Sequence, residues 1–294
     1  MQIESLKVFC DLAESGSFTR AAEREQVAQP SLSQQIMKLE EELGVRLFDR
    51  LGRAVRLTGF GQVFLPRARS ILVELKAAKD EVAERQSSVS GPISIGVIPT
   101  IAPYFLPLPV ALFSRKYPQA DITVVEDVTA RLLDRLRAGQ IDLAILALPQ
   151  RGHDIETFPL RTERLFAILP RNHRLAKKRK LQLKDLRDEP FLLLREDHCF
   201  RETAFEVCKR ARVVPHVVFE SGQFSSIMAM VGAGLGISIV PEMALEQRPD
   251  CNSVLVSDDR ATRTIGVATL RGRYLSRVQR AFLSHMQTFA PKEN

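Results

Sequence analysis

Apolar and polar residues recur at helical spacing through residues 1–45. The apolar positions of the first segment are Leu6, Phe9, Cys10 and Ala13. This spacing predicts a first helix, and Ser17 stands where a capping residue would start a short second helix over 18–24. After a turn near 26–28, Pro30 suits the first turn of a third helix from Ser31 to Leu43, which Gly44 ends.

The predicted third helix has two different faces. Its apolar positions are Leu32, Ile36, Leu39 and Leu43, and its polar positions are Ser31, Ser33, Gln34, Gln35 and Lys38. Two short helices, a tight turn and a third helix with a polar face predict a helix-turn-helix, the motif that inserts its last helix into the major groove of DNA. The alternative is a small helical packing domain with a solvated face.

A short hairpin and a long helix are predicted next. Residues 45–57 alternate in polarity and contain Gly52, which favours a small wing that carries Arg50, Arg53 and Arg56. From Thr58 to about Gln86 the apolar residues keep helical spacing. So long an amphipathic helix most simply pairs with its copy in a homodimer. The Ser- and Gly-containing residues 86–92 then predict a hinge linker.

The rest of the chain alternates between strand and helix patterns. Strands are predicted at 93–98, 121–126, 142–146, 191–194, 217–219 and 237–240, and helices near 104–116, 129–138, 200–211, 224–233 and 273–289. This alternation predicts an α/β fold with a parallel sheet. Ligands bind such sheets at the carboxyl ends of the strands, which points to the loops at Thr100 and Thr129.

These patterns together predict three parts of the chain. They are a winged helix-turn-helix domain over 1–58, a linker helix with its hinge over 59–90, and a regulatory α/β domain over 91–294.

The net charge of the chain does not by itself support the DNA-binding prediction, but its local distribution does. The net charge is +7. Residues 1–90 hold 13 Lys and Arg against 13 Asp and Glu, so the whole surplus lies in 91–294. Net charge alone therefore does not indicate nucleic-acid binding. Within 46–69, however, the arginines outnumber a single acidic residue, Asp49, and this stretch could face phosphates.

Composition excludes several other classes of protein. No apolar run approaches the ~18 residues of a membrane span, and the first residues do not form a signal peptide, so we expect a cytoplasmic protein with no membrane partner. The four cysteines and the histidines follow no metal-ligand spacing, so we expect neither a metal nor a cofactor.

The most informative chemistry lies between Arg195 and Cys208. Apolar residues at helical spacing predict a helix that begins near Asp197, with Asp197 as its N-cap. Cys199 in the first turn would lie at the positive helix end, near His198 and Arg201, and these charges would favour the thiolate that peroxide oxidises.

Cys208 falls on the apolar face of the same predicted helix, where burial would keep it protonated. An intact helix holds the two Cα atoms ~13–14 Å apart, whereas a disulfide requires them within about 7 Å. Bonding the two sulfurs therefore requires the helix to unfold.

The run AAEREQVAQPSLSQQIMKLEEELGVRLFDR (21–50), followed by the basic wing and LTGFGQ (57–62), resembles the N-terminal signature of LysR-type transcriptional regulators. That resemblance implies DNA recognition by the winged helix-turn-helix. The third helix would approach the major groove with Gln29, Pro30, Ser31, Ser33, Gln34 and Lys38. The wing would contact the backbone and minor groove with Arg50, Arg53 and Arg56.

The remainder of the chain resembles the two-lobed effector domain of this family, which is similar to periplasmic binding proteins. The cysteine segment, with the runs at 90–107 and 263–267, is similar to the peroxide-sensing branch of the family. This similarity implies a hydrogen peroxide signal, Cys199 as the peroxidatic residue and Cys208 as the resolving one. Thr100, Thr129 and His198 would orient the peroxide, and we add Arg201 to this group.

The mechanism expected from these features is a homodimer or dimer of dimers that activates transcription together with RNA polymerase. An alternative within the family is a regulator that binds a small metabolite between the two lobes, with two incidental cysteines. A thiol peroxidase would not need a DNA-reading domain, and a solute-binding protein would need an export signal. We therefore expect a transcription regulator that binds double-stranded DNA and is not an enzyme.

Overall fold

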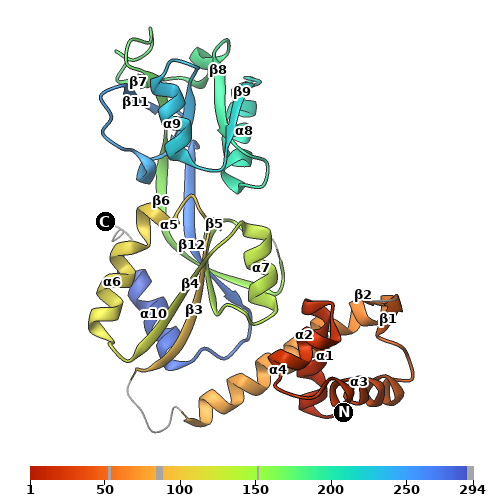
Figure 1. Ribbon diagram of the computed structural model, residues 1–294. Helices are drawn as coiled ribbons and strands as arrows, with labels where there is room; N and C mark the ends of the chain where they lie inside the picture. The colour runs from red at the N-terminus through yellow and green to blue at the C-terminus, as the bar shows by residue number, and fades with distance from the viewer. Residues whose placement is uncertain (52–53, 84–88, 151, 290–294) are drawn as a thin grey trace. The chain divides into compact units, whose positions relative to one another are not determined.

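The computed structural model describes residues 1–51, 54–83, 89–150 and 152–289. Residues are grouped by their contacts into two compact units, a helical N-terminal unit and a larger α/β unit (Figure 1). In the described part of the chain, no helix is both long and apolar enough to cross a membrane. Each unit is described separately below.

The N-terminal unit contains the predicted helices and hairpin. Its elements are α1 (Ile3–Ser15), α2 (Phe18–Arg24), α3 (Gln29–Leu43), β1 (Phe48–Leu51), β2 (Ala54–Leu57) and α4 (Gly59–Ala83). Ser17 caps α2 as expected, because its Oγ accepts a hydrogen bond from the Arg20 amide at 3.5 Å. Gly44 ends α3 with a φ of 69°, a left-handed conformation that favours glycine. The third helix begins two residues earlier than predicted, at Gln29.

The core of this unit is built around one aromatic side chain. Phe9 of α1 packs against Phe48 and Phe64, with ring centroids 5.3 and 5.2 Å away. Leu32, Ile36 and Leu39 of α3 are buried in the same core, whereas Leu43, which the pattern also placed there, is 37% exposed. The helix α4 contributes Phe64, Leu65 and Ala68 to the core, and the large apolar side chains that it leaves exposed are Phe60, Val63, Ile71 and Val82.

The first lobe of the α/β unit is a five-stranded sheet in the order β4-β3-β5-β12-β6. Its strands are β3 (Gly91–Val97), β4 (Ala120–Glu126), β5 (Leu143–Leu148), β6 (Ile155–Pro170) and β12 (Thr262–Leu270), and its helices are α5 (Ala102–Phe105), α6 (Pro107–Lys116), α7 (Thr129–Arg137) and α10 (Arg277–Gln287). Figure 1 shows α6 and α10 on one side of this sheet and α7 on the other. The strands β3, β4 and β5 are parallel, but β12 runs antiparallel to both β5 and β6. The predicted parallel sheet is confirmed for β3, β4 and β5, but β12 and β6 make the whole sheet mixed.

The second lobe is built around the C-terminal end of β6. That strand pairs there with β10 (Ser238–Pro241) and β11 (Cys251–Val256), and β11 pairs with β7 (Lys180–Leu181). A separate parallel pair, β8 (Pro190–Leu194) and β9 (His216–Ser221), packs with α8 (Cys199–Arg210) and α9 (Phe224–Gly232); the short helices η2 (Leu183–Leu186) and η3 (Glu242–Ala244) complete the lobe. In Figure 1, β6 and β12 run side by side out of the first lobe toward the second.

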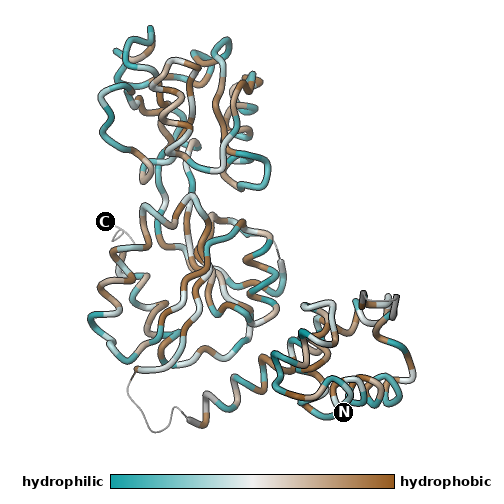
Figure 2. The backbone as a smooth tube through the Cα atoms, in the orientation of Figure 1, coloured by the Kyte–Doolittle hydropathy of each residue, from teal (hydrophilic) through white to brown (hydrophobic). Residues whose placement is uncertain are grey.

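Apolar residues concentrate on the inner strands, which appear brown in Figure 2. All of β5 except its last residue is buried, and β10 is buried throughout. A strand that is buried on both faces has a continuous run of apolar residues in its sequence. This is why the sequence predicted strands at 142–146 and 237–240, where β5 and β10 lie. Residues of β8, α8 and α9 share one core in the second lobe. The position of Cys199 is therefore fixed by a packed helix.

The turn from α9 into β10 depends on one glycine. A Cβ at Gly236 would lie 2.3 Å from the carbonyl oxygen of Pro190, so backbone must move if a side chain is added. We expect Gly236→Ala to lower the free energy of unfolding by about 1–3 kcal/mol, measured by chemical denaturation of the full chain. In the same lobe, an added Cβ at Gly222 comes no closer than 3.4 Å to any atom and meets a flexible arginine first. Gly222→Ala is the matched control, and equal losses in the two variants would contradict the clash.

Candidate functional site

The polar face of α3 is presented as predicted. Leu32, Ile36 and Leu39 bury one side of the helix. On the other side, Ser33 is half-buried, and the exposed predicted residues are Gln29, Pro30, Ser31, Gln34 and Lys38. Amide and hydroxyl side chains on an exposed helix face can read base edges in the major groove. The geometry of α3 therefore suits the recognition helix of the motif.

The wing is only partly described. The strands β1 and β2 pair antiparallel, with Arg50 opposite Val55 and Asp49 opposite the exposed Arg56. Arg53 lies outside the described residues. The hairpin predicted from the alternation over 45–57 is confirmed, while the DNA contacts of the three arginines stay a prediction.

Cys199 is the first residue of α8. The N-cap is His198, which makes no side-chain cap hydrogen bond. The prediction that Asp197 caps this helix was therefore wrong by one residue, and Asp197 pairs instead with Arg195 at 3.4 Å. The placement of Cys199 in the first turn is confirmed. Its thiol is next to the unpaired amides of a helix N-terminus.

The thiol of Cys199 is not acidified as expected. Burial raises its pKa above the ordinary value, and this effect outweighs the Thr129 hydroxyl and the Arg263 charge, which both lower it. Glu202, on the same helix, raises the pKa further. The reduced thiol is therefore protonated at neutral pH. The cation that acts on it is Arg263, which the sequence reasoning did not select.

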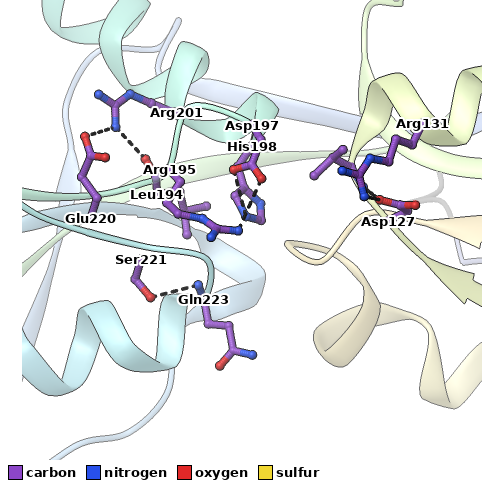
Figure 3. A network of polar contacts seen from close by, with 11 residues as sticks. Asp127, Arg131, Leu194, Arg195, Asp197, His198, Arg201, Glu220, Ser221 and Gln223 are labelled. Carbon is purple, nitrogen blue, oxygen red and sulfur yellow. Dashed lines mark hydrogen bonds and ion pairs between the residues drawn. The ribbon is translucent and has the colours of Figure 1, made fainter.

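Two of the predicted peroxide-orienting residues, Arg201 and His198, lie in the second lobe but bring no free positive charge to the thiol. The Arg201 guanidinium donates to the Leu194 carbonyl at 3.0 Å and to Glu220 Oε1, an ion pair that Figure 3 shows. His198 is buried, and burial lowers its pKa, so it is neutral at neutral pH. Neither residue supplies the positive charge that we expected beside Cys199.

The two predicted threonines have different surroundings, because Thr129 acts on Cys199 directly and Thr100 contacts Arg263. Thr129 Oγ1 is buried and has no hydrogen-bond partner among the described residues, although it is close enough to Cys199 to lower the pKa of the thiol. Thr100 is buried, and its Oγ1 accepts a hydrogen bond from Arg263 Nη1 at 3.0 Å.

A buried ion pair anchors this arrangement. Arg263 of β12 and Glu163 of β6 are direct cross-strand neighbours, and their closest nitrogen–oxygen distance is 2.6 Å. Glu163 also accepts a hydrogen bond from the Met243 amide at 2.9 Å. The Arg263 guanidinium carbon lies 5.2 Å from the centre of the Phe200 ring, directly after Cys199. The run at 263–267 carried the signal for Arg263, but nothing in the sequence paired it with Glu163.

A cleft of about 1000 Å³ opens at Cys199. Thr129, Arg263 and Cys199 all line it, together with Thr262, Thr264 and Arg210. Thr100, His198 and Arg201 are not among its lining residues. No group of His, Cys, Asp and Glu suited to holding a metal ion occurs among the described residues.

Cys208 lies two residues before the end of α8 and is buried in the core of the second lobe. Burial raises its pKa to about 12, as predicted for the apolar face. Both cysteines are free thiols. The two cysteines are nine positions apart in the sequence. Because α8 is continuous from Cys199 to Arg210, the helical rise places their Cα atoms ~13–14 Å apart. The predicted separation by an ordered helix is confirmed.

Comparisons with known proteins agree with this architecture. Residues 3–62 match the bacterial regulatory helix-turn-helix proteins of the lysR family, and residues 86–291 match the LysR substrate binding domain. The chain is 32% identical to the uncharacterized HTH-type transcriptional regulator YybE of Bacillus subtilis, over 97% of this chain and 98% of that protein. It is 33% identical to the DNA-binding transcriptional dual regulator OxyR of Escherichia coli, over 93% and 92% of the two chains.

A solved structure extends the likeness to the whole fold. A full-length OxyR variant from Pseudomonas aeruginosa superposes with a TM-score of 0.84 at 31% identity, covering 100% of this chain and 99% of the other. The two family matches together span nearly all of the chain, and the family consists of transcription regulators and not of enzymes. The protein therefore belongs to the LysR family of DNA-binding transcriptional regulators and is related to OxyR.

Proposed function

We propose that this regulator senses hydrogen peroxide through a thiol and disulfide switch between Cys199 and Cys208. The observation that carries the proposal is their placement in α8, one at the cleft end and the other in the core. The related proteins named hydrogen peroxide-inducible genes activators support the same assignment.

The proposed reaction has two steps, oxidation of Cys199 to a sulfenic acid and formation of the disulfide with Cys208. The Cys199 thiol loses its proton, and the thiolate sulfur attacks one oxygen of the peroxide. The oxygen–oxygen bond breaks, the sulfur becomes a sulfenic acid, and water leaves after protonation. Cys208 then loses its proton and attacks the Cys199 sulfur. A sulfur–sulfur bond replaces the sulfur–oxygen bond, and a second water is released.

The second step rearranges the fold. The Cα atoms must approach within about 7 Å, so the residues between the two cysteines leave the helix. Phe200 then loses its place in the core, where its ring meets Phe224 edge to face at 5.1 Å and also lies next to Arg263. Since these contacts belong to the packing of the second lobe, oxidation changes the surface of that lobe. This is the conformational signal in our proposal.

The output is a change in DNA binding. We propose that α3 reads base edges with Gln29, Ser33 and Gln34, and that the wing arginines contact the backbone. The exposed apolar residues of α4, which include Val63 and Ile71, suit the interface of a homodimer. Two such dimers on neighbouring half-sites, in contact with RNA polymerase, complete the proposed assembly.

One observation favours a second candidate function. The cleft at Cys199 has a volume of about 1000 Å³, the upper range of a small-molecule site and far larger than hydrogen peroxide requires. A regulator that binds a metabolite in this cleft would leave Cys208 buried and unreacted. The thiol experiment below separates the two functions.

Peroxide should join the two switch cysteines specifically. Trypsin cleaves after Arg195, Arg201 and Lys209, so it places Cys199 and Cys208 on separate peptides. After substoichiometric peroxide, mass spectrometry should find these two peptides joined by a disulfide. Cys199→Ser should abolish the peroxide response of a reporter gene. Cys251→Ser, which alters a partly exposed cysteine elsewhere in the lobe, should retain it. Unreacted thiols at both switch positions would contradict the proposal.

The peroxide reaction should accelerate with pH. Because burial raises the pKa of Cys199, the thiolate is a minor species at neutral pH. Its fraction, and hence the observed rate of Cys199 oxidation, should rise about tenfold for each pH unit between pH 6 and 8. Stopped-flow measurement of the reduced protein tests this dependence. A rate that is constant over this range would mean that the thiol is already ionised, contrary to the buried environment.

The two parts of the DNA interface should respond differently to substitution. Gln34→Ala should weaken binding to the operator by about 1–3 kcal/mol while leaving the salt dependence unchanged, because it removes a base contact. Arg56→Gln should weaken binding to all sequences and reduce the slope of log affinity against log salt by about 1, because it removes a phosphate contact. Fluorescence anisotropy at several salt concentrations distinguishes them. The same slope change in both variants would contradict the assigned roles.

A further inference from the structure

The buried Glu163–Arg263 pair is unusual in its surroundings. Both side chains are at most 3% exposed, and they face each other across β6 and β12. The adjoining cross-strand pair is an ordinary hydroxyl contact, with 2.8 Å between Thr162 Oγ1 and Thr264 Oγ1. Removing two charges from water is costly, and apolar residues of similar volume often replace buried ion pairs without loss of stability. A requirement other than stability would account for this pair.

The surroundings of Arg263 show what its charge acts on. Its Nη1 donates to Thr100 Oγ1, its Nη2 lies 3.4 Å from the Thr100 carbonyl oxygen, and its guanidinium stacks near Phe200. Arg263 also lines the cleft together with Cys199. Arg263 also donates from Nε to Glu163 Oε1 at 2.8 Å, so Glu163 is its charged hydrogen-bond partner and Thr100 is its neutral one.

Glu163 is itself held from a third element. Its Oε2 accepts the Met243 amide hydrogen at the start of η3. The carboxylate is therefore fixed by backbone on one oxygen and by Arg263 on the other. The Glu163 carboxylate therefore keeps Arg263 in its present position.

We propose that Glu163 is a positioning residue that acts through Arg263 to restrain the reactivity of the Cys199 thiol. The carboxylate anchors the guanidinium and offsets part of its positive charge, so a thiolate at Cys199 is stabilised less than a lone arginine would stabilise it. The thiolate is thereby kept a minor species, so Cys199 is oxidised slowly while peroxide is scarce. This inference rests on the proposed peroxide function for its biological meaning, although the effect itself is measurable on the reduced thiol.

The other groups that face the thiol are few. Thr129 of α7 and Arg263 of β12 favour the thiolate, and Glu202 of α8 opposes it. The remaining charged residues at the cleft near the helix start are Glu196 and Asp197, which are exposed, and Asp259 and Arg260 come from the loop before β12. Of these groups, the substitutions below change only Arg263, so a shift in the titration of Cys199 reports on the ion pair.

Alkylation of the reduced full-length protein tests the proposal. Iodoacetamide labelling of the Cys199 tryptic peptide, followed by mass spectrometry across a pH series, gives the midpoint of thiolate formation. Glu163→Gln removes the negative charge and keeps an oxygen for Arg263, so we expect this midpoint to fall by about one pH unit and labelling at pH 7 to be about tenfold faster. Glu156→Gln, the same change at an exposed position of β6, should leave the midpoint unchanged.

A second pair of variants keeps the test decisive if Glu163→Gln does not fold. Arg263→Met should raise the midpoint, because it removes the cation. The double variant Arg263→Met/Glu163→Gln buries no charge, and its midpoint should equal that of Arg263→Met, since an unpaired buried Glu163 takes up a proton. Different midpoints would show that Glu163 does not act through Arg263. An unchanged or raised midpoint in folded Glu163→Gln would overturn the proposal.

The outcome is separable from that of the proposed function. Should peroxide fail to join Cys199 to Cys208 while the alkylation midpoint still shifts, the redox function is wrong and the role of Glu163 stands. If the disulfide forms but the alkylation midpoint does not shift, the redox function stands and the proposed role of Glu163 is wrong.

Discussion

The continuity of α8 is the constraint on which the rest of the structure depends. One helix carries both Cys199 and Cys208, and its rise keeps the two thiols much farther apart than a disulfide allows. The same helix buries Phe200, Ala204 and Val207 in the second lobe. The distance between the sulfurs and the packing of the lobe are therefore not independent. Any reaction that joins the sulfurs also removes core residues from their places.

Burial and charge compete at the cleft end of this helix. The helix N-terminus, the Thr129 hydroxyl and Arg263 all favour a thiolate, yet desolvation prevails and the pKa of Cys199 lies above its ordinary value. In our proposal, Glu163 partly offsets the positive charge of Arg263. A thiol held protonated beside groups that can stabilise its anion is suited to respond when an oxidant enters the cleft. The same balance explains how a buried ion pair can serve function more than stability.

Local patterns predicted the N-terminal unit well because its helices have one apolar face and clear end signals. Ser17 and Gly44 marked helix boundaries at the expected places. Long-range pairing was not predictable in this way. The strand β6 mixes exposed and buried residues irregularly, so its partnership with β12 was missed, and with it the contact between Glu163 and Arg263. Arg201 was chosen because it is near Cys199 in sequence, but the helix directs its side chain to Glu220.

Amide hydrogen exchange across α8 tests the account most directly. In the reduced protein the amides from Thr203 to Cys208 should be protected, because they are hydrogen-bonded within a packed helix. After one equivalent of peroxide, protection should be lost in this segment and retained in a helix of the same unit, such as α10. A bond between the two sulfurs with the protection of α8 unchanged would contradict the account, because the thiols would then have joined without the helix unfolding.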